Sequence, residues 1–190
     1  MNYHWTWGIF LEQVKGGDET YLDWLLTGFG WTVAVSLSAW VIALSLGILF
    51  GVLRTVPSRT LVAVATAWVE LFRNVPLLVQ MFLWFFVVPE LLPADWGLWV
   101  KQELPAKEFL TATICLGLFT SSRVAEQVRA GIQALPHGQL MAGLAMGLTL
   151  PQTYRYVLLP TALRMVVPPL TSEFMNVFKN SSVAFAIGVM

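Results

Sequence analysis

The 190-residue sequence is poor in the side chains that metal sites, disulfides and most catalytic centres require. It has one cysteine, Cys115, and two histidines, His4 and His137. An intrachain disulfide is therefore excluded, and neither a Cys/His zinc site nor a nucleophile with a partnered base is expected. Only 12% of the residues are charged, and eleven basic side chains balance eleven acidic ones. Without a basic surplus to neutralise phosphates, nucleic-acid binding is not expected as a function.

Apolar residues, in contrast, are abundant. They make up 57% of the chain, and the mean hydropathy of +0.69 is far above that of soluble domains. The N-terminus is not expected to be a signal peptide, because its first basic residue, Lys15, lies among acidic ones and no small-residue cleavage site precedes the first apolar run. The composition therefore predicts an all-α integral membrane protein.

Four stretches are long and apolar enough to predict membrane-spanning helices. They are residues 24–53, 61–88, 109–130 and 161–190. Gly47 and Gly51 have the G-x-x-x-G spacing of closely packed helices, a spacing that also arises by chance in a glycine-rich chain. The last stretch runs to Met190 without a charged tail or a helix stop signal. This favours a C-terminally truncated chain over a reading frame that ends there.

The charges outside these stretches alternate in sign and predict the orientation. Residues 1–23 carry one basic against four acidic side chains, and residues 90–108 carry two against four. The loop 54–60 has two basic side chains and no acidic one, and residues 123–164 have four basic against one acidic. Because loops rich in Lys and Arg stay in the cytoplasm, we expect residues 1–23 outside, and the loop 54–60 and residues 130–160 inside.

The cytoplasmic stretch 137–160 is predicted to form two short helices, because glycine and proline residues interrupt it. The first runs over about residues 139–146 and ends at Gly147. The second begins with a capping box from Thr149 to Gln152 and is expected to close at Pro160. The apolar side chains of the first helix need a cover. Either they pack on the protein's own membrane helices, or they fit a groove of a soluble partner.

Charged residues inside the predicted spans are costly in a bilayer unless they are paired. Glu70 and Arg73 lie three residues apart on one helix face, which predicts an ion pair. Three residues with the same spacing predict a structural charge network at the inner end of the third span: Arg123, Glu126 and Arg129. In the last span, four residues form one polar stripe that is expected to face protein or water: Glu173, Asn176, Lys179 and Asn180. The Glu173 carboxylate is expected to form a structural ion pair.

Several segments resemble signatures of one family. The run 138–143, GQLMAG, followed by Gly147 and by VLLP at residues 157–160, resembles the E-A-A loop of type I ABC importer permeases. Residues 69–80, VELFRNVPLLVQ, resemble the E-L-F-R-G-T-P-L-L-V-Q signature of the polar-amino-acid subfamily. Four further segments resemble family sequences: residues 88–93, 123–132, 145–152 and 179–182. Of these, residues 88–93 and 145–152 resemble the permease subunits of glutamate/aspartate importers most closely.

The resemblance implies a MetI-like ABC transporter transmembrane fold over residues 24–190, with a fifth span beyond the end of this chain. It also implies a multi-pass protein of the bacterial inner membrane with a periplasmic N-terminus. The implied partners are ABC ATPase subunits, a second permease subunit of the same or a different sequence, and a periplasmic amino-acid-binding protein. This chain lacks the G-x-x-x-x-G-K-[ST] phosphate loop, so ATP and Mg²⁺ are expected on the partner ATPase and no cofactor on this chain.

The resemblance assigns the coupling to the ATPase to the cytoplasmic segment: Gln139, Met141, Ala142, Gly143, Gly147 and Pro160. Two of these positions depart from the family pattern. Met141 stands where the family has glutamate, so any ion pair from that position to the ATPase is lost. Gly143 stands where the family has its second alanine. Coupling at this segment is therefore expected to depend on its shape.

For a cargo with carboxylates, Arg73 and Lys179 are the natural cationic partners. The predicted substrate path comprises five residues: Arg73, Asn74, Pro76, Asn176 and Lys179. The competing interpretation is that the charged residues among them only hold the helices together. A secondary transporter and a structural membrane subunit remain alternatives for the whole chain, although the first has no evident use for a cytoplasmic docking segment.

Overall fold

The computed structural model describes residues 6–14 and 17–189, and all named elements within these ranges are helical. Residues 1–5 and 15–16 of the expected outer segment, and residue 190 of the last expected span, lie outside the described residues. The α-helices are α1 (Tyr21–Leu53), α2 (Arg59–Asn74), α3 (Leu77–Phe82), α4 (Val88–Leu91), α5 (Ala94–Leu98), α6 (Lys107–Gln133), α7 (His137–Ala145), α8 (Leu150–Thr153) and α9 (Leu159–Asn180). The other elements are π-helical turns at Leu83–Val87, Trp99–Glu103 and Tyr154–Leu158, and 3₁₀ helices at Trp7–Leu11 and Ser181–Ile187.

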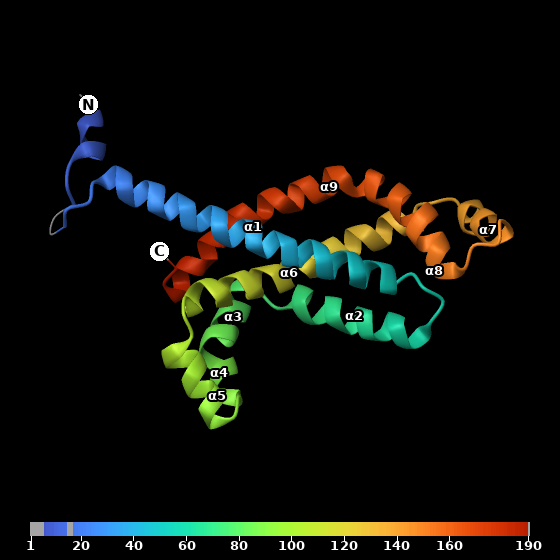
Figure 1. The fold of residues 1–190 in the computed structure, drawn as a ribbon, viewed down its shortest axis with the longest axis horizontal. Coiled ribbons are helices and arrows are strands. Elements are labelled where there is room, and N and C mark those ends of the chain that lie inside the picture. Colours follow the sequence, from blue (N-terminus) through green and yellow to red (C-terminus); the bar gives the residue numbers. More distant parts are fainter. Residues whose placement is uncertain (1–5, 15–16, 190) are drawn as a thin grey trace.

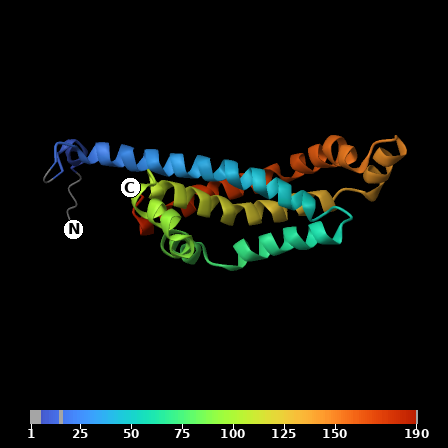
Figure 2. The same cartoon turned by 60° about the horizontal axis from the view of Figure 1, so that its bottom comes forward.

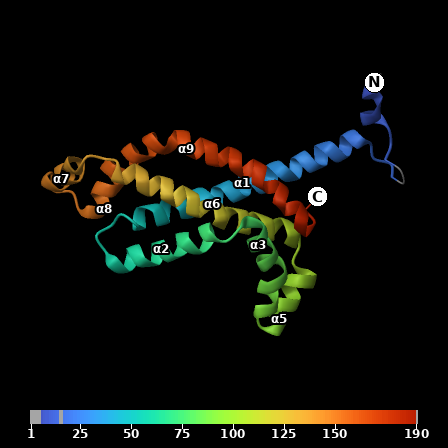
Figure 3. The same ribbon diagram turned by 180° about the vertical axis from the view of Figure 1, so that it is seen from behind.

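Helices α1, α2, α6 and α9 form an elongated bundle (Figures 1 and 3). α6 is its central helix, because it contacts α1, α2, α3 and α9. α7 lies at one end of the bundle. The segment from α3 to α5 projects sideways near the other end, as Figures 1 and 2 show. We call residues 77–103 the side arm.

α1 is a single helix of 33 residues, about 50 Å long at 1.5 Å per residue. It starts with a capping box in which the Thr20 backbone N–H and hydroxyl both donate to the Asp23 carboxylate. These hydrogen bonds hold the pKa of Asp23 below its usual value. Beyond this cap α1 is apolar on all sides. Its most apolar 18-residue window has a mean hydropathy of 2.3, and only 28% of that window is buried inside the molecule. Its remaining surface is suited to lipid.

α1 and α6 approach each other closely because glycines face the contact. A Cβ atom on Gly47 would lie 2.5 Å from the Val124 Cβ, and one on Gly51 would lie 2.7 Å from the Val128 Cβ. Gly117 of α6 is in the same situation, because its Cβ would lie 2.8 Å from the Ile42 side chain. The G-x-x-x-G spacing in α1 therefore marks real helix packing and not a chance pattern.

The expected continuous span 61–88 is broken, and the prediction was wrong on this point. α2 ends at Asn74, Val75 and Pro76 are extended, and the segment Leu77–Leu91 then runs at 100° to α2. Proline has no N–H and disfavours helical geometry in the residue before it, which explains why the break falls here. The segment ends at Leu91, and the outer loop expected after it contains α5 and a π-helical turn.

Pro160 does not close a short helix, in contrast to the expectation. α8, the π-helical turn after it and α9 follow one another without a break from Leu150 to Asn180. Pro160 lies in the first turn of α9, directly after the π-helical turn, where the hydrogen-bond register changes and a missing N–H is tolerated. The α-helix expected to run on to residue 190 gives way at Ser181 to a 3₁₀ helix.

Among the described residues, length and hydropathy single out fewer candidate spans than the four expected. α1 is long and apolar enough to cross a membrane, and the bent pair of α2 with Leu77–Leu91 is a second candidate if it is counted as one span. α6 and α9 are long enough, but neither contains an 18-residue stretch that is sufficiently apolar and poor in charged residues. The helices that pack around α6 bury several of its polar residues away from lipid, among them Thr120, Ser121 and Ser122.

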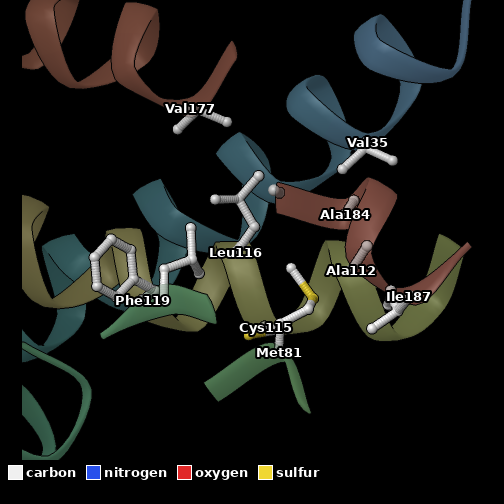
Figure 4. Packing of buried hydrophobic residues seen from close by; sticks show 11 residues of the cluster. Val35, Met81, Ala112, Cys115, Leu116, Phe119, Val177, Ala184 and Ile187 are labelled. Carbon is white, nitrogen blue, oxygen red and sulfur yellow. The ribbon is translucent and has the colours of Figure 1, made fainter. Parts of the chain in front are cut away.

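The buried apolar residues form two clusters along the bundle. The first joins α1, α3, α6, α9 and the C-terminal 3₁₀ helix, and Figure 4 shows Met81 of α3 beside Cys115 of α6 in its centre. The second lies toward the α7 end and joins α1, α6 and α9, with Val128 and Ala162 fully buried. Both clusters are built around α6, so the helices at both ends of the molecule are fixed relative to one central element.

Candidate functional site

α7 stands at the end of the bundle where α1 ends and α2 begins (Figure 1). It spans His137–Ala145 and contacts the π-helical turn that leads into α9, and α8. The Tyr154 hydroxyl in that turn donates to the Thr55 carbonyl, 2.8 Å away, just after α1. The α7 end is therefore connected both to the last long helix and to the first.

The turn after α7 depends on a glycine. Gly147 has a φ of +84°, in the left-handed region that L side chains rarely adopt. Its N–H donates to the Leu144 carbonyl, and the Leu148 N–H donates to the Gly143 carbonyl. These two bonds form a Schellman motif, which ends α7 and sets the direction of the chain into α8.

Gly143 allows α7 to contact α8 directly. A Cβ at this position would lie 2.5 Å from the Thr153 Cγ2, and the Thr153 side chain is fully buried. The capping box predicted at Thr149 is confirmed, because Gln152 accepts from the Thr149 backbone N–H at 2.8 Å. Glycine in place of the family's second alanine thus permits a closer contact between the two short helices.

Leu140 of α7 packs against the second apolar cluster, but the other large apolar side chains at this end are exposed. Met141 is 66% exposed and Met146 is 72% exposed, and Leu144 and Tyr156 are exposed near them. Of the other residues predicted to couple to an ATPase, Ala142, Gly147 and Pro160 are exposed, Gln139 is half-buried and Gly143 is buried. Of the two alternatives left open by the sequence, the geometry favours an apolar surface that is free to receive a partner. We call Met141, Leu144, Met146 and Tyr156 the α7 patch.

Glu126 is the centre of the charge network near this end. Its carboxylate pairs with Arg54 at 2.7 Å, with Arg73 at 3.0 Å and with Arg129 at 3.1 Å. Arg54 directly follows α1, Arg73 lies in the last turn of α2, and Arg129 belongs to α6 itself. One carboxylate on the central helix therefore connects three helices. The sequence pattern contained Glu126 with Arg129 but missed Arg54, which follows the apolar run of α1 and looked like an ordinary loop charge.

The predicted pair of Glu70 with Arg73 does not form. Glu70 is exposed and makes no ion pair with any described residue, whereas Arg73 binds Glu126. A helical side chain leans toward the N-terminus of its helix, so the long Arg73 side chain extends along α2 toward the end where Glu126 lies. Arg123 also departs from the expected network, because its nearest carboxylate is Glu173 of α9, 4.0 Å away.

The residues predicted for a substrate path lie in two groups. Arg73 and Asn74 end α2 and Pro76 follows at the break, and all three are exposed. Asn176 and Lys179 belong to α9; Asn176 is half-buried, and Lys179 is exposed with no ion pair to a described residue. Within the described residues, no group of three or more His, Cys, Asp or Glu side chains is placed to hold a metal ion.

The fold and the sequence match one family of transport proteins. Residues 43–189 fit the model of the binding-protein-dependent transport system inner membrane component. The chain belongs to this family. The matched range begins in the last third of α1 and includes all of α2 to α9, so the side arm, the α7 patch and most of the bundle lie in the shared domain.

Individual relatives support the same assignment. The glutamate/aspartate import permease protein GltJ of Escherichia coli K12 is 58% identical over 192 residues, which covers all of this chain and 78% of the relative. The glutamate/aspartate import permease protein GltK of Escherichia coli O157:H7 is 31% identical, covering 88% of this chain and 74% of the relative. A crystal structure described as an amino acid ABC transporter with histidines matches with a TM-score of 0.69 and 26% identity, covering 88% of this chain and 75% of that one. The predicted fold class and family are thus confirmed.

Proposed function

We propose that this chain is a permease subunit of an ATP-driven importer of glutamate and aspartate. The 58% identity to GltJ carries this proposal, because the aligned region covers all of this chain, the break at Pro76 and the α7 segment included. The permease itself hydrolyses nothing. ATP and Mg²⁺ act on a partner ATPase, a periplasmic binding protein delivers the cargo, and a second permease subunit completes the path. The similarity to GltK favours a pair of different subunits.

The α7 patch is the proposed contact with the ATPase. It combines an exposed apolar surface with the short helices that Gly143 and Gly147 hold in place. The proposed orientation puts this end in the cytoplasm and the N-terminus in the periplasm of the inner membrane. Closure of the ATPase dimer would then move α7 and, through the continuous helix from Leu150 to Asn180, rotate the bundle as a rigid body.

The substrate path is proposed to run past Arg73, Asn74 and Pro76 on one side and Asn176 and Lys179 on the other. Lys179 makes no ion pair among the described residues, so its ammonium group is available to a cargo carboxylate. Arg73 is bound to Glu126 in this conformation and would contact cargo only after that pair opens.

Uptake by proteoliposomes that contain the assembled transporter and its binding protein tests the function. We expect ATP-dependent aspartate uptake that vanadate abolishes, that a protonophore leaves unchanged, and that excess glutamate inhibits at least tenfold while arginine does not. Uptake that resists vanadate and fails with the protonophore would establish a secondary transporter instead. Undiminished uptake by a complex without this chain would reduce it to a structural subunit.

A further inference from the structure

The break between α2 and α3 deprives two backbone carbonyls of their usual donors. In a continuous α-helix, the Phe72 carbonyl would accept from the N–H of residue 76, and the Val75 carbonyl from that of residue 79. Pro76 has no N–H, and the extended Val75, with φ of −96° and ψ of 129°, takes the chain out of helical register. Buried carbonyls without a donor are costly, above all in a membrane protein.

Gln80 supplies the donors for both carbonyls. Its side-chain Nε2 lies 2.8 Å from the Phe72 carbonyl and 2.8 Å from the Val75 carbonyl, and the residue is only 4% exposed. Its backbone N–H also donates to the Pro76 carbonyl, at 3.0 Å. Because both hydrogens of one amide group are used, the orientation of the amide is determined: the reverse orientation would place Oε1 against two carbonyl oxygens.

The neighbours of Gln80 fix α3 on its other side. Leu77 and Met81 belong to the buried cluster around Cys115 and Leu116 of α6, which Figure 4 shows for Met81. α3 is therefore attached to α6 by apolar packing and to α2 by the Gln80 amide. The Gln80 Oε1 atom is buried and accepts no hydrogen bond from any residue that the structure describes. The amide is thus only partly satisfied, which limits how strongly it holds the joint.

From this geometry we propose that Gln80 is a positioning residue that latches the joint between α2 and the side arm. The angle between α2 and α3 can change only after the two hydrogen bonds from Nε2 have broken. The latch therefore favours the bent arrangement, with the side arm held at 100° to α2. This inference concerns the joint alone and holds whichever cargo the protein carries.

The distance between two spin labels tests the latch. Labels are attached at Leu71→Cys in α2 and Leu91→Cys in α4, both at exposed positions, in a Cys115→Ala background in nanodiscs. With Gln80 in place we expect one narrow distance distribution. In Gln80→Met, which keeps the volume and removes the donors, the ratio of molecules outside that peak to molecules within it should rise about tenfold or more. Gln102→Met, an exposed glutamine of the side arm, is the matched control and should leave the distribution unchanged.

A second background separates hydrogen bonding from packing. Pro76→Ala returns an N–H that can serve the Phe72 carbonyl, so Gln80→Met should have a smaller effect in this background. If Gln80→Met folds only together with Pro76→Ala, the donor role is likewise supported. A distance distribution of Gln80→Met equal to that of Gln102→Met would overturn the proposal. So would an equal shift, or a failure to fold, in both backgrounds, because plain packing would then explain the residue.

Discussion

Replacement of Gly47 by leucine is expected to separate α1 from α6 and to remove most of the folded protein from the membrane. The Cβ atom alone would lie 2.5 Å from the Val124 Cβ and 3.0 Å from the Ser121 carbonyl oxygen. Neither neighbour can yield, because Val124 is fully buried and the oxygen belongs to the backbone of α6. We expect a cost of about 3 kcal/mol, the upper end for overpacked cores. The loss of stability is measured as the fall in unfolding temperature of the purified protein, with size-exclusion chromatography as the readout of the folded fraction.

Gly30→Leu is the matched control for this variant. Gly30 lies on the same helix, and a Cβ there would meet nothing within 4 Å. The same added side chain should therefore leave both abundance and the unfolding temperature at the wild-type level. Equal unfolding temperatures for the two variants would show that the close contact of α1 with α6 contributes little to the fold.

Replacement of Gly147 by leucine is expected to abolish transport while the protein stays in the membrane. The position is open, so the new side chain meets no obstacle, but a φ of +84° costs an L residue about 1–2 kcal/mol. The turn relieves that strain by changing its backbone angles, which breaks the bond from Leu148 to the Gly143 carbonyl and reorients α7 relative to α8. Uptake by proteoliposomes, normalised to the amount of permease, should fall at least tenfold.

Two further variants make this result specific. Gly138→Leu adds the same side chain in the first turn of α7, at an equally open position without a positive φ, and should transport normally. Gly147→Asn should keep part of the activity, because asparagine tolerates the left-handed region better than other side chains. If Gly147→Leu transports like Gly138→Leu, the geometry of this turn is not needed for coupling.

The sequence was most informative where short-range signals decide the structure. The uncharged run from residue 24 to 53 does form part of one helix, and the glycine at 147 and the capping box at Thr149 mark the ends of the short helices. Each of these features depends on residues a few positions apart, so no knowledge of the fold was needed to find them. The family motifs were equally local and predicted the family correctly.

The sequence was misleading where distant residues decide the structure. Pro76 was visible, but whether a proline bends a helix slightly or by 100° depends on where the next segment packs, here on α6 through Met81. The spacing of Glu70 and Arg73 pointed to a local ion pair, whereas the nearest available carboxylate for Arg73 is Glu126, 53 positions later. Pro160 looked like a helix end because its tolerance after a π-helical turn cannot be recognised from residue types.

Labelling of a cysteine on the α7 patch tests the central claim, that this end of the bundle faces the cytoplasm and receives the ATPase. Met141→Cys in a Cys115→Ala background places one reactive thiol at an exposed position of α7. A membrane-impermeant maleimide should label it in inverted vesicles and not in intact spheroplasts, and prior assembly with the ATPase should block the labelling. Labelling in intact spheroplasts, or equal labelling with and without the ATPase, would contradict the account.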